Sequence, residues 1–197
     1  MESQPASNIE SIKRQTVMVP SVVAIIAAIL LCASYFLPFT MAKEDSIVTS
    51  QFAQSFEIYE GSGVTASDLA NPSIITWARF YKAYCDRLEK PVTSDLNDYS
   101  AVFWLIVVSG VLAVLALLFA LLRKATPTAL FALANLGLML LISQYFEDYG
   151  PVSSGAASNW AFGRMALLGF AAVLVAAGIW LFIAKWRQKH LVSGQQQ

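Results

Sequence analysis

Four apolar runs dominate this chain of 197 residues. A membrane-spanning helix needs about 20 residues to cross the roughly 30 Å hydrocarbon core, and the runs at 17–39, 101–122, 127–146 and 160–185 are all long enough. Only 13% of the residues are charged and 57% are hydrophobic, so too little polar chain exists to cover four buried core helices in water. The sequence therefore predicts an all-α membrane fold, a four-helix transmembrane bundle.

Polar segments separate these runs and define the rest of the chain. The parts predicted to lie outside the membrane are the tails 1–16 and 186–197, the insert 40–100, the turn 123–126 and the loop 147–159. Because the turn is so short, the second and third helices are predicted to form a tight antiparallel hairpin. The insert is long enough for a small structured unit between the first and second helices.

The distribution of basic residues predicts which side of the membrane each segment faces. Loops rich in Lys and Arg close to a span stay in the cytoplasm. One side carries seven basic and two acidic residues, and the other carries six basic and eleven acidic residues. The seven basic residues are Lys13, Arg14, Arg123, Lys124, Lys185, Arg187 and Lys189. Both termini are therefore predicted to be cytoplasmic, with the insert and the loop 147–159 on the opposite side.

Residues that commonly carry catalysis, metals or cofactors are scarce. The chain has one His and two Cys. Because His190 is in the C-terminal tail, the sequence provides no axial histidine for a haem between the helices. No CxxC pair and no metalloprotease, hydrolase or phosphate-loop motif is present. The net charge is zero, so no basic field indicates nucleic acid. We expect no catalytic residue, no metal site, no cofactor and no enzymatic activity.

Asn135 is the central polar residue of the third run. Inside lipid, an amide of this kind usually forms a hydrogen bond with a neighbouring helix, and that is its predicted role. The alternative is a polar seam of Asn135, Gln144 and Arg164 that carries a small solute or a lipid.

Arg164 is the one charged residue inside the fourth run, and it lies about one turn beyond Trp160. A charge at this position needs a partner or a path to the headgroups. Glu147 and Asp148 end the third run on the same side, so an ion pair at the outer interface is predicted. Contact with a lipid phosphate and substrate binding are the alternatives. An enzyme acting at this interface would need a pocket that joins the three groups.

The segment 77–90, WARFYKAYCDRLEK, predicts an amphipathic helix within the insert. Asn71 and Pro72 precede it in the order preferred at a helix start, and Pro91 follows. Apolar residues recur every three or four positions and form a stripe along one face. The stripe consists of Ile74, Trp77, Ala78, Tyr81, Cys85 and Leu88, flanked by Phe80 and Tyr84.

Three covers for this stripe are compatible with the sequence. Residues 47–60, whose alternating pattern favours a strand or a hairpin without excluding a helix, can pack against it. The helix can instead lie on the outer leaflet with its rings at headgroup level. The third cover is another protein, with Trp77, Phe80, Tyr81 and Tyr84 as the contact residues.

Aromatic residues gather near the predicted outer interface, as they do in many membrane proteins. They are Tyr35, Phe36, Phe39, Tyr99, Phe103, Trp104, Tyr145, Phe146, Tyr149 and Trp160. We expect these rings to lie at the level of the lipid headgroups.

The layout of four spans, cytoplasmic termini, a long first outer loop and a tight inner turn resembles that of claudins and tetraspan proteins. The claudin first-loop signature of Trp, Gly-Leu-Trp and two Cys is absent, so this resemblance implies no barrier function. A closer resemblance is to uncharacterised four-helix membrane proteins of Gram-positive bacteria. It is carried by SYFLPF at 34–39, FEDYGPVSSG at 146–155 and the Trp- and Gly-containing run at 159–180. It implies a bacterial cytoplasmic membrane and no particular activity.

Chemically inert spans beside one aromatic insert favour a non-enzymatic multi-pass membrane protein. The lipid bilayer is one expected partner. The insert is expected to form an extracytoplasmic cap that contacts another membrane or envelope protein, which would make the chain an accessory or interaction subunit. The alternative function is a component of a small-solute or lipid transporter or channel.

Overall fold

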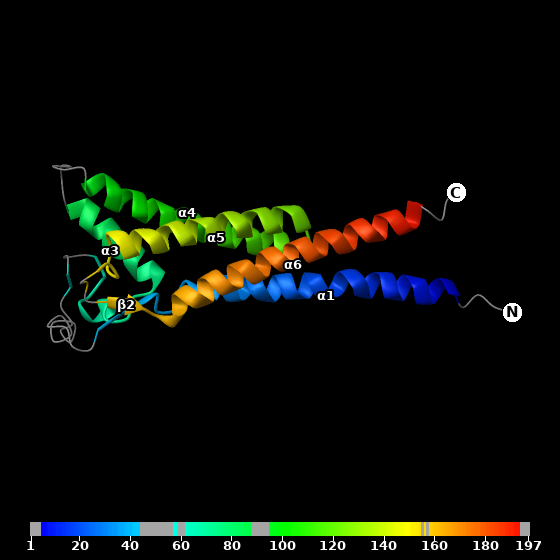
Figure 1. The fold of residues 1–197 in the computed structure, drawn as a ribbon, viewed down its shortest axis with the longest axis horizontal. Coiled ribbons are helices and arrows are strands. Elements are labelled where there is room, and N and C mark those ends of the chain that lie inside the picture. The colour runs from blue at the N-terminus through cyan, green and yellow to red at the C-terminus, as the bar shows by residue number, and fades with distance from the viewer. Residues whose placement is uncertain are drawn as a thin grey trace.

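Four long helices lie side by side in the computed structural model and form the predicted bundle (Figure 1). The structure describes residues 5–43, 57–58, 62–87, 95–154, 156 and 158–193. The long helices are α1 (Pro5–Ser34), α4 (Asp95–Leu121), α5 (Ala125–Asp148) and α6 (Phe162–Ser193). Each contains a stretch long and apolar enough to cross a membrane: Val17–Ser34, Tyr99–Leu121, Ala125–Asp148 and Phe162–Lys189. The architecture is that of a multi-pass membrane protein.

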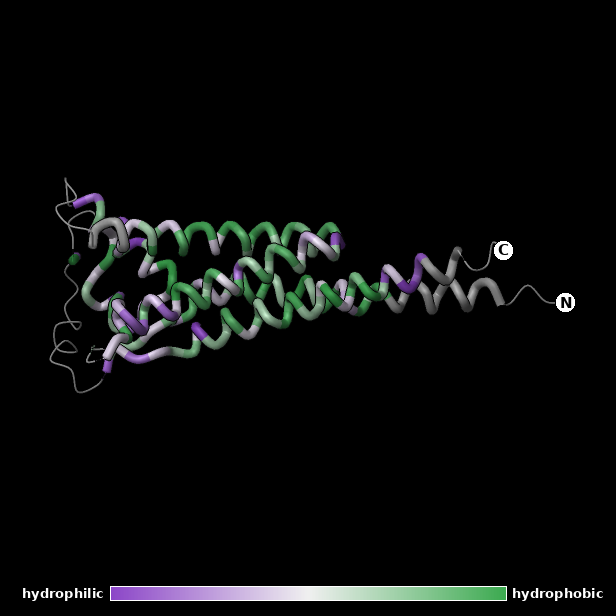
Figure 2. Tube along the Cα trace, turned by 45° about the horizontal axis from the view of Figure 1, so that its top comes forward, coloured by the Kyte–Doolittle hydropathy of each residue, from purple (hydrophilic) through white to green (hydrophobic). Residues whose placement is uncertain are grey.

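The bundle has two different ends. Helix α1 packs against α6, α4 against α5, and α5 against α6. Both termini lie at one end, where α1 and α6 extend beyond the turn between α4 and α5 (Figure 1). We call this the terminal end and the opposite one the cap end. Hydrophobic residues dominate the middle of the bundle, and hydrophilic residues gather towards both ends (Figure 2).

The first helix differs from the predicted span 17–39 at both ends. It starts earlier and runs through Pro20, because one proline removes a single hydrogen bond from an otherwise continuous helix. It stops at Ser34, five residues before the predicted end. Pro38 disfavours helical backbone at Leu37, and the chain turns there towards the cap.

The described part of the insert folds over the cap end. Helix α3 (Ile74–Arg87) packs against α4. Strand β1 (Thr40–Ala42) pairs antiparallel with β2 (Ser158–Trp160), with Thr40 opposite Trp160. This small sheet therefore joins the insert to the loop before α6. Apart from Glu57 and Ile58, the predicted strand or hairpin at 47–60 lies outside the described residues.

Ser73, rather than Asn71, caps α3. The Ser73 hydroxyl oxygen accepts a hydrogen bond from the backbone N–H of Thr76 at 3.1 Å, which satisfies one of the free donors at a helix start. Pro72 precedes the helix, and its carbonyl accepts a hydrogen bond from the backbone N–H of Phe39 at 2.8 Å. The start of α3 is thus tied directly to the chain that leaves α1.

Gly178 allows α5 and α6 to approach closely. A Cβ atom on Gly178 would lie 2.9 Å from the Cβ atom of Ala129 and 3.1 Å from its Cα atom. Small residues at such crossings are the usual means by which helices associate in lipid. Gly169, on the same helix, has no such neighbour, since a Cβ there would meet nothing within 4 Å.

Replacing Gly178 with Leu is therefore expected to destabilise the bundle by about 1–3 kcal/mol, because the added atoms force α5 and α6 apart. The measurement is the unfolding midpoint of the purified protein in mild detergent. Gly169→Leu is the matched control and should change stability little. Equal effects of the two substitutions would contradict this close approach.

Candidate functional site: the aromatic cap

Trp77 anchors α3 to the bundle. Its indole Nε1–H donates to the Thr40 hydroxyl oxygen at 3.0 Å. Its ring meets that of Phe146 edge-on, with the ring centroids 5.6 Å apart. Trp77 is only 7% exposed and Thr40 is fully buried. The single polar group of the indole is therefore satisfied while its apolar surface is covered, which gives α3 a defined position.

Three rings beneath α3 join the ends of three transmembrane helices. Phe39, which follows α1, makes edge contacts with Phe146 of α5 at 5.7 Å and with Trp160 at 5.5 Å between centroids. The rings of Phe146 and Trp160 are nearly parallel, with centroids 6.4 Å apart. Phe39 and Phe146 are buried inside the protein. These two rings therefore pack against the protein, and their position at headgroup level stays a prediction.

Backbone contacts close the same region. The N–H of Gly163 donates to the carbonyl of Pro38 at 2.8 Å, and the N–H of Ala161 donates to that of Phe39 at 3.1 Å. A Cβ atom on Gly163 would lie 2.3 Å from the Pro38 oxygen. The start of α6 can therefore approach the end of α1 only with glycine at this position.

The aromatic stripe of α3 is covered by the bundle itself. Tyr81 is 2% exposed, and its ring lies 5.7 Å from that of Tyr99 on α4 and 6.2 Å from that of Phe146. The burial of Trp77 and Tyr81 does not fit the predicted contact with the outer leaflet or a partner, because the interior of the protein takes that place. The sequence did not suggest this cover.

Phe80 and Tyr84 lie at the edge of the buried cluster. Both are half-buried. Phe80 meets Trp77 at 5.6 Å between ring centroids, and Tyr84 meets Tyr99 at 5.0 Å. Arg87, one helical turn beyond Tyr84, is exposed. These two rings are therefore the predicted contact residues that stay accessible at the surface of the cap.

Burial raises the pKa of Tyr81 strongly, with smaller contributions from the neighbouring Tyr145 and Tyr99. A phenol whose pKa is higher in the folded state than in the unfolded state contributes stability below the unfolded value, near pH 10. That contribution is lost as the pH rises above this value, because only the unfolded chain then ionises readily.

We therefore expect the free energy of unfolding to fall as the pH is raised above about 10, by up to about 1.4 kcal/mol per pH unit for this one group. Tyr81→Phe should lower stability near neutral pH only modestly and should reduce this alkaline slope. The measurement is denaturant unfolding of both proteins between pH 8 and 11. Identical slopes would contradict the assignment to Tyr81.

The ion pair predicted for Arg164 is present at the cap end and involves Glu147. Arg164 Nη2 lies 3.3 Å from Glu147 Oε1, and the same carboxylate oxygen accepts a hydrogen bond from the Trp160 indole at 3.0 Å. The guanidinium carbon of Arg164 lies 4.0 Å from the centroid of the Trp160 ring. Asp148, the other predicted partner, is exposed on the next position. These contacts hold the loop before α6 against the end of α5.

Asn135 connects three parts of the bundle. Its side-chain Nδ2 donates to the Tyr35 hydroxyl at 2.7 Å and to the backbone carbonyl of Ser109 at 2.6 Å. Asn135 is completely buried, so these bonds link α5 to α4 and to the end of α1 away from water. The predicted interhelical role of Asn135 is confirmed.

The polar seam considered for transport is not assembled. Gln144 follows Asn135 by nine residues, which places it on the opposite side of α5. Accordingly, Gln144 is exposed whereas Asn135 is buried. Arg164 is engaged at the cap end with Glu147. Within the part of the chain that the structure describes, no group of three metal-ligating side chains comes together either.

Replacing Asn135 with Leu is expected to destabilise the bundle by about 1–3 kcal/mol, because it leaves the Ser109 carbonyl without its buried donor. Ser143→Ala, on the same helix, is the matched control. The Ser143 hydroxyl is buried without a hydrogen-bond partner, so its removal should be neutral or slightly stabilising. Unfolding in detergent measures both changes, and a larger loss for Ser143→Ala would contradict this view of the interior.

No known protein-family model, no curated protein and no solved structure matches this chain. The likeness to claudins, tetraspan proteins and four-helix proteins of Gram-positive bacteria thus remains one of layout and short motifs.

Proposed function

We propose that this protein is a non-enzymatic accessory subunit that presents its cap to another membrane or envelope protein. The cap consists of α3, the β1–β2 sheet and residues 62–73, which precede α3. The observation that carries the proposal is the packing of α3 on the bundle, which leaves the rings of Phe80 and Tyr84 partly exposed at the edge of a buried aromatic cluster. Aromatic residues with charged neighbours are typical anchors of protein interfaces.

The contacts that anchor α3 support this role. Trp77 and Tyr81 hold α3 from below, and the Ser73 cap and the Pro72 carbonyl fix its start. A surface that is ordered before binding loses less conformational entropy when a partner arrives. A small cap of this kind can therefore contribute affinity out of proportion to its size.

The distribution of charge supports an extracytoplasmic cap. The terminal end carries most of the basic residues close to a span, and this bias marks the cytoplasmic side. We therefore propose that the termini are cytoplasmic, in a bacterial cytoplasmic membrane. The transporter alternative has less support, because Asn135 is buried in contacts between helices and Gln144 lies on the other side of α5.

Site-specific photo-cross-linking in native membranes tests the docking role. A photo-reactive amino acid at position 87, one helical turn from Tyr84, is expected to capture a protein partner. Tyr84→Ala should lower that yield by at least about tenfold if the ring is an interface anchor. Tyr84→Phe keeps the ring and should retain most of the yield.

Position 82, exposed on another side of the same helix, is the matched control for the photo-reactive group. Capture of the same protein from both positions, without dependence on Tyr84, would contradict a docking face at Phe80 and Tyr84. So would adducts with lipid alone from position 87. Unchanged unfolding of each variant in detergent shows that the cap is still folded.

A further inference from the structure

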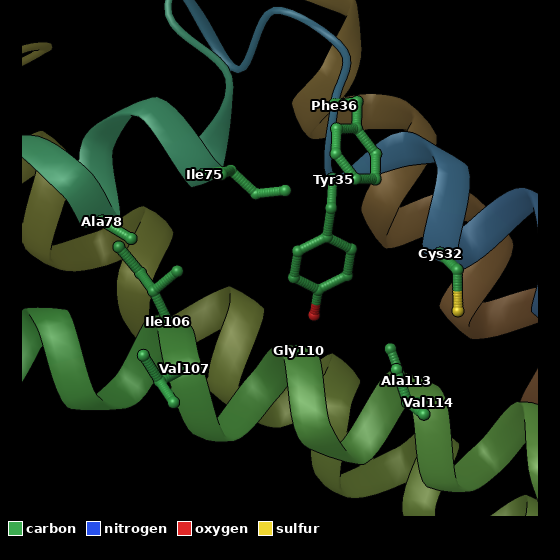
Figure 3. Close-up of a pocket in the computed structure, with 10 residues that line it drawn as sticks. All are labelled: Cys32, Tyr35, Phe36, Ile75, Ala78, Ile106, Val107, Gly110, Ala113 and Val114. Atoms are coloured by element: carbon green, nitrogen blue, oxygen red, sulfur yellow. The ribbon is translucent and has the colours of Figure 1, made fainter. Parts of the chain in front are cut away.

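A half-open apolar groove lies between α1 and α4, beneath α3 (Figure 3). It encloses about 390 Å³, within the roughly 300–1,000 Å³ of pockets that hold small ligands. Tyr35 closes one side, Ile106 and Gly110 of α4 form another, and Ile75 and Ala78 of α3 lie above. The lining consists almost entirely of hydrocarbon.

The groove exists because small residues on α4 leave the space open. A Cβ atom on Gly110 would reach only the edge of the Tyr35 ring, at 3.8 Å. The Tyr35 hydroxyl, the polar group nearest this space, already accepts the hydrogen bond from Asn135. A polar solute would therefore find few hydrogen-bond partners in this groove. A hydrocarbon chain needs no hydrogen-bond partner and would fit the apolar lining.

The groove lies at the depth of the lipid chains. Its α4 residues, from Ile106 to Val114, belong to the span Tyr99–Leu121. Farther towards the cap, Tyr99 at the start of this span contacts Tyr81 and Tyr84 of α3. The C-terminal half of α3 therefore lies closer to the membrane surface on the cap side. Ile75 and Ala78, in the N-terminal half, lie deeper.

Two basic residues of α3 follow the two α3 residues that line the groove. Arg79 follows Ile75 by four residues and Lys82 follows Ala78 by four, so each lies one helical turn farther along nearly the same side. Both are exposed. Lys82 forms an ion pair with Asp86 on the next turn. The charge of Arg79 interacts with the carboxylate of Asp68 at more than ion-pair distance, so Arg79 is the cation that can still make a direct contact with an external anion. A guanidinium binds a phosphate particularly well.

We propose that this groove binds one hydrocarbon chain of a phosphate-bearing lipid from the leaflet on the cap side, with the lipid phosphate held by Arg79. The pairing of an apolar groove at chain depth with a cation at headgroup level matches the two ends of such a lipid. This binding goes beyond the proposed docking role, which uses Phe80 and Tyr84 on another side of α3. Each proposal can fail without the other.

Photo-labelling of the wild-type protein tests the site directly. The protein is reconstituted in vesicles of a zwitterionic phospholipid with a minor amount of phosphatidylglycerol that carries a photo-reactive group on its acyl chain. After irradiation, mass spectrometry of peptides maps the adducts. Adducts concentrated on the segments around Cys32 and Ile106–Val114 are expected. Labelling spread evenly over the lipid-facing sides of α5 and α6 would overturn the proposal.

Two substitutions separate the chain site from the headgroup site. Gly110→Leu fills the groove and is expected to lower labelling there by at least about fivefold, since the bound chain loses its packing contacts. Arg79→Gln is expected to lower it by about fivefold, in line with roughly 1 kcal/mol for one basic residue at an anionic surface. Arg87→Gln, on another side of α3, is the control and should have little effect.

The outcomes decide between the occupants. Unchanged groove labelling in Gly110→Leu, or equal effects of Arg79→Gln and Arg87→Gln, would overturn the proposal. If a second copy of the chain occupies the groove instead, lipid labelling there is absent in the wild-type protein, which also overturns the proposal. The wild-type map needs no substitution and stands even if one variant fails to fold.

Discussion

Lipid offers no hydrogen-bond partner, so polar groups inside this bundle are stabilised when they find partners within the protein. Hydrogen bonds within the helices satisfy most of the backbone N–H and carbonyl groups. Asn135 adds to them by bonding the Tyr35 hydroxyl and the Ser109 carbonyl, and these two bonds hold three parts of the chain in one register. The Tyr35 ring, fixed by the same contact, then forms a wall of the apolar groove between α1 and α4.

The same constraint shapes the cap. Where the chain leaves α1 it stops being helical, so its backbone groups bond to Pro72, to the loop before α6 and to Gly163. Aromatic rings fill the space between these segments, and Trp77 satisfies its one donor on Thr40. The cap is thus an extension of the membrane core. Its outward features, the edge rings and the cations of α3, rest on that buried support.

Particular residues show how much of the structure could be predicted from the sequence. The four spans and the interhelical role of Asn135 were predicted because lipid imposes length and polarity rules that act on each segment separately. The pair between Arg164 and Glu147 was foreseen because a charge within a span needs a partner. The start of α3 was placed at Asn71 instead of Ser73, because several residues in that stretch can cap a helix. The cover over Trp77 and Tyr81 was missed, since rings at a membrane interface look alike in sequence whether lipid or protein surrounds them.

The sequence alone determined the number of spans and the arrangement of both termini at one end, because hydrophobic length is a local property that needs no knowledge of neighbours. Only the tertiary structure decided which aromatic rings are buried, that 40–42 pairs with 158–160, and that a groove opens beside Gly110. Those features depend on contacts between residues far apart in the chain, and no local pattern records which of many possible neighbours will meet.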